Sequence, residues 1–140
     1  MKNKNLLESF NRAIDGLVFC FQTQRNIRLH ALAALLVLSL SLGLHLTKVE
    51  LLFVFIAIIF VLVTETLNTA IEATIDLITP RYHPLARVAK DVAAGAVLLA
   101  AINAVVTGYL VFFPKLNPVL PKVIENITHS PAHLTLIAII

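Results

Sequence analysis

The chain has 140 residues, of which 59% are hydrophobic and 14% are charged, and its mean hydropathy is +0.90. Soluble domains average about 25% charged residues, so this composition argues against a globular all-β enzyme, a nucleotide-binding α/β domain and a disordered regulator. It indicates instead one small helical membrane protein. The net charge of +3 comes without a basic patch interleaved with aromatic residues, so no nucleic-acid partner is expected.

The first element in chain order is an amphipathic helix, which we expect over residues 5–28. Its apolar residues recur at spacings of three and four and are Leu6, Phe10, Ile14, Leu17, Val18 and Phe21. Polar Arg12, Asp15 and Gln22 fall elsewhere around the helix. Such a helix lies in the membrane interface or packs on a partner subunit, and the pattern leaves both alternatives open.

Three hydrophobic segments follow, which predict transmembrane helices over about residues 30–47, 50–78 and 88–113. The first segment is apolar except for two serines and His45, and the second contains a long uninterrupted apolar run. As a helix, residues 91–113 would extend about 34 Å, enough to cross a hydrocarbon core of about 30 Å. Since backbone groups in lipid must be hydrogen-bonded internally, the fold class is all-α integral membrane.

The lysines and arginines are distributed unequally between the two sides of these spans. The cations before the first span or between the second and third are Lys2, Lys4, Arg12, Arg25, Arg28, Arg81, Arg87 and Lys90, and those on the other side are Lys48, Lys115 and Lys122. The positive-inside rule therefore places the N-terminus and the second loop in the cytoplasm. One membrane domain is expected over residues 1–116, followed by an appended, proline-interrupted tail over 117–140.

The most informative segment is a polar stripe near the end of the second span, formed by Glu65, Asn68, Glu72 and Asp76. On a helix of 3.6 residues per turn these four side chains fall within about 80° of one another. The stripe begins just below the cytoplasmic headgroups and emerges through them. A carboxylate at that depth costs free energy and needs a partner or a function, so a polar clamp between helices is the structural alternative.

The chemistry of this stripe suits metal-assisted phosphoryl transfer. Carboxylate and amide oxygens are hard ligands of the kind that Mg²⁺ prefers, and a nearby carboxylate can act as a base toward an alcohol. The interfacial depth indicates that this alcohol is a lipid hydroxyl group. No GxxxxGK[ST] motif occurs among the four glycines, so any nucleotide is held without a P-loop.

The stripe ETLNTAIEATID, followed by HPLARVAKDVAAGAV over residues 83–97, resembles the prokaryotic diacylglycerol kinase family, which includes an undecaprenol kinase branch. The resemblance covers roughly residues 9–115, and the second motif is closer to the undecaprenol kinase branch. It implies a bacterial plasma-membrane protein that uses ATP and Mg²⁺ to phosphorylate undecaprenol or diacylglycerol to its monophosphate. It also implies a homotrimer with active sites shared between neighbouring subunits and facing the cytoplasm.

The resemblance also assigns roles to individual residues. By position, Glu65 becomes the general base that accepts the proton of the lipid hydroxyl group. Glu72 becomes a Mg²⁺ ligand, and Asn68 supports the site beside it. The residues implied to contact or order the nucleotide are Arg12, Asp76, Arg81, Tyr82, His83, Lys90 and Asp91.

One position departs from the family pattern. The family usually carries Glu-Arg-Asn before the first span, and that Glu is a second metal ligand, whereas this chain has Gln24 followed by Arg25 and Asn26. Gln24 keeps a neutral oxygen ligand but removes a negative charge, which is expected to weaken Mg²⁺ binding. A non-catalytic or weakly active membrane scaffold that retains the kinase fold is therefore the alternative. A carrier is disfavoured, because transporter sites lie near the bilayer midplane.

Overall fold

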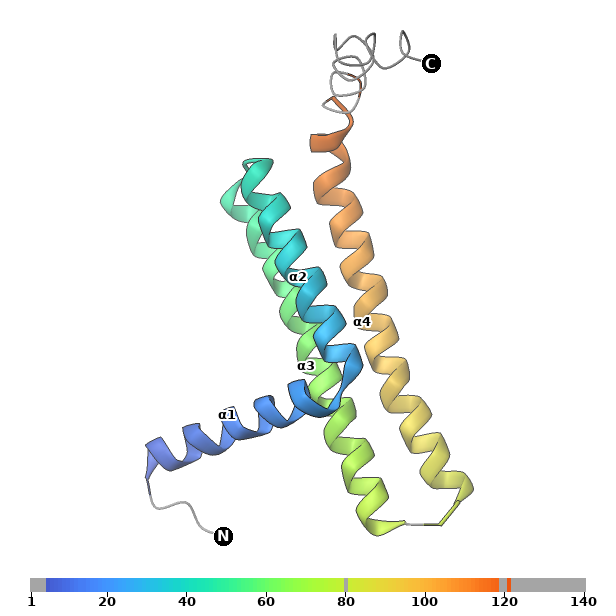
Figure 1. Cartoon of the computed structure of the whole chain (residues 1–140). Helices are drawn as coiled ribbons and strands as arrows, with labels where there is room; N and C mark the ends of the chain where they lie inside the picture. Colours follow the sequence, from blue (N-terminus) through green and yellow to red (C-terminus); the bar gives the residue numbers. More distant parts are fainter. Residues whose placement is uncertain (1–4, 80, 119–120, 122–140) are drawn as a thin grey trace, which may run out of the picture.

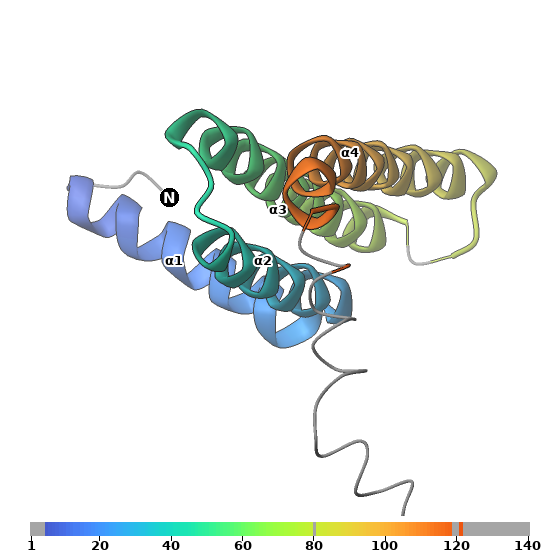
Figure 2. The ribbon, with the colours of Figure 1, turned by 90° about the horizontal axis from the view of Figure 1, so that it is seen from above.

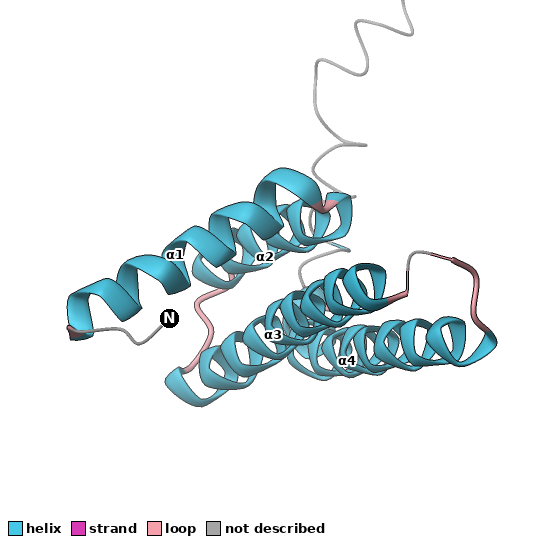
Figure 3. Cartoon of the chain, turned by 90° about the horizontal axis from the view of Figure 1, so that it is seen from below, coloured by secondary structure: helices cyan, strands magenta, loops and turns pink. Residues whose placement is uncertain are grey.

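The computed structural model describes residues 5–79, 81–118 and 121, and these residues form helices and no strand (Figures 1 and 3). The four helices are α1 (Leu6–Thr23), α2 (Arg25–Gly43), α3 (Lys48–Ile78) and α4 (Pro84–Leu116). The all-α fold class is confirmed. The expected tail over 117–140 lies outside the described residues, apart from residues 117, 118 and 121.

Three of the helices are long and apolar enough to cross a membrane, namely α2, α3 and α4. At 1.5 Å per residue, the 19 residues of α2 extend about 29 Å, which matches the hydrocarbon core. With 31 and 33 residues, α3 and α4 are longer than that core is thick. The prediction of three helices that can span a membrane is therefore confirmed.

The segment expected as one helix over residues 5–28 contains a corner at Gln24. The backbone of Gln24 is extended, with φ −98° and ψ 121°, so α1 ends at Thr23 and α2 begins at Arg25. Arg28 stabilises the corner, because its guanidinium donates to the carbonyl oxygens of Phe21 (3.1 Å) and Gln22 (3.0 Å). A cation from α2 thus satisfies the free carbonyl groups at the C-terminus of α1.

The turn between α2 and α3 is set by local chemistry. His45 adopts a positive φ of 51°, which stops the chain from continuing as a helix and ends α2 at Gly43 rather than near residue 47. Thr47 and Glu50 then form a capping box, in which each side chain bonds the other residue's backbone N–H group, at the start of α3. Leu44 and Leu46 pack against a small core around Val54 and Phe112.

Helices α3 and α4 form an antiparallel hairpin that is joined by an ion pair near each end. Lys115 lies 3.3 Å from Glu50 at one end, and Lys90 pairs with Asp76 at the other. Glu65 follows Glu50 by fifteen residues and Ala100 precedes Lys115 by fifteen, so this register places Ala100 level with Glu65. Both are buried, with exposed fractions of 0% for Ala100 and 2% for Glu65.

The α3–α4 turn lies at the same end of the molecule as α1. In Figure 1, α1 projects sideways from the start of α2, whereas α2, α3 and α4 run lengthwise beside one another. Seen from above, α3 and α4 lie together as one pair, and α1 and α2 form a second pair beside them (Figure 2). Large apolar side chains on the spans are exposed, among them Leu35 and Leu98, as expected for surfaces that face lipid or neighbouring subunits.

Candidate functional site

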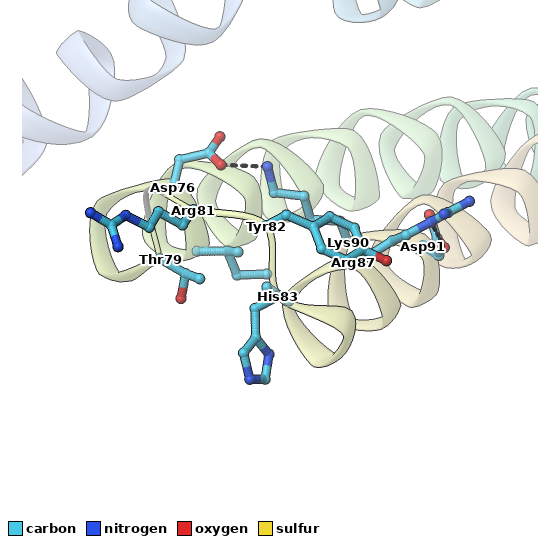
Figure 4. Close-up of a pocket in the computed structure, with 10 residues that line it drawn as sticks. Asp76, Thr79, Arg81, Tyr82, His83, Arg87, Lys90 and Asp91 are labelled. Atoms are coloured by element: carbon cyan, nitrogen blue, oxygen red, sulfur yellow. Dashed lines mark hydrogen bonds and ion pairs between the residues drawn. The ribbon is translucent and has the colours of Figure 1, made fainter.

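A polar cavity of about 350 Å³ lies at the α3–α4 turn (Figure 4). Three segments contribute to it: the last turn of α3, the connecting loop and the first turns of α4. The polar residues that line it are Asp76, Thr79, Arg81, Tyr82, His83, Arg87, Lys90 and Asp91. The structure therefore brings together six of the residues that the sequence assigns to the nucleotide.

The start of α4 is fixed by local signals that also orient the cavity. The Nδ1 atom of His83 accepts a hydrogen bond of 3.2 Å from the backbone N–H of Leu85, which caps the helix. Pro84 occupies the first helical position, where its missing N–H group has no cost. With this start, Arg87, Lys90 and Asp91 are spaced by three and four residues and share one helix face.

Two ion pairs organise the charge of the cavity. The Lys90 ammonium lies 2.5 Å from Asp76, which connects α4 to α3. The second pair is longer and entirely within α4, since Arg87 Nε lies 3.7 Å from Asp91 Oδ2. Arg81 makes no ion pair with any described residue. Three cations and two carboxylates leave the cavity with an excess of positive charge, which suits a polyphosphate ligand.

Deeper along α3, the first half of the polar stripe is buried, whereas Glu72 is partly exposed and Asp76 is exposed. The exposed fractions are 2% for Glu65, 8% for Asn68 and 4% for Thr69. The Thr69 hydroxyl donates to the Glu65 carbonyl oxygen, but the Glu65 carboxylate receives no hydrogen bond from the described residues. A buried carboxylate without a donor is expensive to maintain as structure alone, which favours a functional role.

Asn68 and Glu72 form a second, adjoining pair on the same stripe. Asn68 Nδ2 donates to Glu72 Oε1 at 3.0 Å, so the amide is oriented with its nitrogen toward the carboxylate. The Asn68 Oδ1 atom is then left buried without a partner among the described residues. Buried amide oxygens are nearly always hydrogen-bonded, so this atom is a candidate ligand or acceptor position.

The donor set of the stripe fits Mg²⁺ by chemistry. Glu65, Asn68 and Glu72 offer carboxylate and amide oxygens, which are the ligands that this hard cation takes, and the Asn68 oxygen is unpartnered. Within the described part of the chain, no three His, Cys, Asp or Glu side chains converge on one point. One subunit therefore presents a partial ligand set, of the kind that nucleotide phosphates complete.

Two of the residues assigned by the sequence lie outside the cavity at the α3–α4 turn. Arg12 is on α1, where its guanidinium is 2.6 Å from Glu8. Gln24 is half-buried at the corner between α1 and α2. Neither residue lines the cavity at the α3–α4 turn.

The structure also adds residues that the sequence motifs did not single out. Arg87 and Thr79 line the cavity, and Thr69 is buried next to Glu65. For Arg87 a signal was present, because it stands three residues before Lys90 and therefore on the same face of α4. Thr69 gave no such signal, since a threonine in a membrane helix usually bonds its own backbone.

Comparisons with known proteins identify relatives of this chain. The family model for prokaryotic diacylglycerol kinase matches residues 11–112, which include the whole cavity and the polar stripe. A diacylglycerol kinase of Synechocystis sp. is 43% identical over 113 residues, 80% of this chain and 65% of the relative, so the chain spans slightly less than two thirds of that protein. An undecaprenol kinase of Bacillus subtilis is 44% identical over 109 residues, 78% of this chain and 89% of the relative. A diacylglycerol kinase of Escherichia coli is 51% identical over 47 residues, 34% of this chain.

Proposed function

Since this chain belongs to the prokaryotic diacylglycerol kinase family, we propose that it transfers the γ-phosphoryl group of ATP to the hydroxyl group of a membrane lipid. The acceptor is undecaprenol or diacylglycerol, as the names of the relatives in Bacillus and Synechocystis suggest. The observation that carries the proposal is that α3 carries both the buried Glu65 carboxylate and, further along the same polar stripe, Asp76 of the positively charged cavity.

Glu65 is the general base in this proposal. The lipid oxygen attacks the γ-phosphorus, the bond from that phosphorus to the β–γ bridging oxygen breaks, and ADP leaves. The hydroxyl proton passes to Glu65, whose carboxylate has no competing donor among the described residues. Glu65 lies about 16 Å of helix away from Asp76, on the part of α3 that runs into the apolar span, which is the side from which a lipid hydroxyl group would approach.

The cavity at the α3–α4 turn holds the phosphates of ATP. Lys90 and Arg81 supply positive charge, and Tyr82 and His83 lie on the connecting loop where they can cover the nucleotide. Asp76 orders this side of the site through its pair with Lys90. Phosphoryl transfer depends mainly on such positioning and charge stabilisation, so few other groups are required.

Mg²⁺ is the proposed metal, held by Glu72 and Gln24 with Asn68 in support. Bound there, the ion would supply positive charge that offsets the charge of the phosphates. Asn68 restrains Glu72 through the hydrogen bond between their side chains and directs its own oxygen away from that carboxylate. The burial of Glu65 and Asn68 keeps bulk water from the base, which limits hydrolysis of ATP in place of lipid phosphorylation.

A homotrimer with the active site shared between subunits completes this arrangement. Within one subunit, Arg12 on α1 does not line the cavity, so its proposed contact with the nucleotide would be made in a neighbouring subunit's site. Exposed apolar side chains on the spans offer surfaces for that contact. In the assembled protein, α1 lies in the cytoplasmic interface, and the α3–α4 turn faces the cytoplasm, as the distribution of lysines and arginines predicts.

The alternative is a weakly active or non-catalytic membrane scaffold, and Gln24 is the residue that favours it. A neutral amide at that position offers less attraction to a divalent cation than a carboxylate does. The two functions are separated by measuring ATP-dependent phosphorylation of undecaprenol and diacylglycerol by the purified protein. Turnover that disappears in Glu65→Gln supports the kinase, and no turnover of either lipid by a correctly assembled protein supports the scaffold.

A further inference from the structure

Arg87 lines the same cavity as Lys90 and Asp91 but has no role in the phosphoryl transfer described above. It stands in the first turn of α4, and the side chain is 70% exposed. In Figure 4 the Arg87–Asp91 pair and the Arg81 side chain lie on opposite sides of the Asp76–Lys90 pair. Cationic groups are therefore distributed along the length of the cavity rather than gathered at one point.

The two ion pairs of the cavity differ in how firmly they hold their cation. Lys90 is only 34% exposed and its contact with Asp76, at 2.5 Å, joins two helices. Arg87 reaches Asp91 only at 3.7 Å, four residues along the same helix, and both side chains are about 70% exposed. Exposed pairs of this kind contribute little free energy, so the Arg87 guanidinium can leave Asp91 for a stronger acceptor.

A phosphate group is such an acceptor. The guanidinium presents N–H donors in a planar fork that matches two phosphate oxygens, and it keeps its charge at any physiological pH. A triphosphate that extends along the cavity therefore meets Arg81 at one end, Lys90 in the middle and Arg87 at the other.

We propose that Arg87 is a phosphate-binding residue that anchors the end of the ATP polyphosphate nearest to Asp91. This inference rests on the proposed function, because it takes ATP as the ligand of the cavity. It adds a third cation to the phosphate contacts of Lys90 and Arg81, and it makes Arg87 and Lys90 the phosphate-binding residues of α4.

The test compares Arg87→Ala, Arg87→Lys and the wild type as purified full-length protein. Two quantities are measured: the KM for ATP at saturating lipid, and the Kd for ATP in a Glu65→Gln background, where chemistry is removed. Arg87→Ala should raise both by about tenfold, which is the loss expected for one charge-assisted hydrogen bond, with kcat within about twofold. Arg87→Lys should lie between, because it keeps the charge and loses the fork.

Two control variants separate phosphate binding from general effects on the helix or on net charge. Val88→Ala changes a residue next to Arg87 that is exposed and does not line the cavity. Lys48→Ala removes a cation at the end of α3 that is far from the cavity. Both should retain the wild-type KM and Kd. If the wild type binds ATP and Arg87→Ala binds it within twofold as tightly, the assignment of Arg87 is wrong and the proposed function stands. A wild type that does not bind ATP overturns both.

Discussion

The Lys90 ammonium lies 2.5 Å from the Asp76 carboxylate, an ion pair that joins the last turn of α3 to the first turns of α4. The pair closes the α3–α4 hairpin at the end that carries the polar cavity. In the proposed site, Lys90 would exchange this partner for a phosphate group of the nucleotide. Mutations can separate the contribution of Lys90 to the hairpin from its proposed contribution to nucleotide binding.

Asp76→Asn and Lys90→Ala should destabilise the folded protein by similar small amounts, under about 1 kcal/mol, because the pair is partly exposed. The effects on ATP should differ. Lys90→Ala removes a phosphate-binding cation and should raise the KM for ATP at least tenfold, whereas Asp76→Asn leaves that cation in place. Thermal unfolding in detergent and steady-state kinetics give the two quantities. Equal KM values in the two variants would show that Lys90 serves the hairpin alone.

Glu65→Gln should abolish turnover and leave ATP binding largely intact. The amide has nearly the same shape, so the burial beside Ala100 is preserved while the base is lost. The measurements are lipid phosphorylation and the Kd for ATP. Glu50→Gln is a matched control at the opposite end of α3 and should retain activity. A near-normal rate of lipid phosphorylation by Glu65→Gln would show that Glu65 is not the general base.

Gln24→Glu should lower the Mg²⁺ concentration required for half-maximal activity severalfold. A carboxylate at this corner restores a negative charge where a divalent cation is proposed to bind. The measurement is a Mg²⁺ titration of kcat at saturating ATP. Gln24→Ala is the complementary variant, and it should raise the requirement. A large gain in kcat on restoring Glu would support a degraded site, and an unchanged Mg²⁺ requirement would show that position 24 does not contact the metal.

Ala100→Leu should reduce kcat by at least tenfold with little change in the KM for ATP. The register of the hairpin places this fully buried residue level with Glu65, so a larger side chain has no room and displaces the carboxylate. Overpacking also costs about 1–3 kcal/mol, so folding is checked by thermal unfolding. Ala96→Leu, on an exposed part of α4, is the control. Unchanged kcat in a folded Ala100→Leu protein would contradict the register.

Sequence reasoning predicted the helical class and the three spans because hydrophobic length in a membrane admits few alternatives. Helix ends were less predictable. The extended backbone of Gln24 and the positive φ of His45 depend on contacts such as the Arg28 bonds, which no periodicity reveals. The family resemblance was confirmed by the comparisons.

The candidate site, too, could be predicted from the sequence only in part. A helical stripe is a local pattern, so the alignment of Glu65, Asn68 and Glu72 could be read from spacing, and the structure buries Glu65 and Asn68 and leaves Glu72 partly exposed. The gathering of Asp76 with Lys90 depends on how α3 meets α4 and could be inferred only from the resemblance. Arrangements that involve a second subunit, including the positions of Arg12 and Gln24 at the nucleotide, stay predictions.

The central claim is that this chain phosphorylates a lipid alcohol with Glu65 as the base. It is tested most directly by presenting undecaprenol and diacylglycerol side by side to the purified, assembled protein with ATP and Mg²⁺, and by measuring the monophosphate of each. We predict that at least one lipid is phosphorylated by the wild type and that neither is phosphorylated by Glu65→Gln. Absence of both monophosphates with the wild type, or equal turnover by the two proteins, would contradict the account.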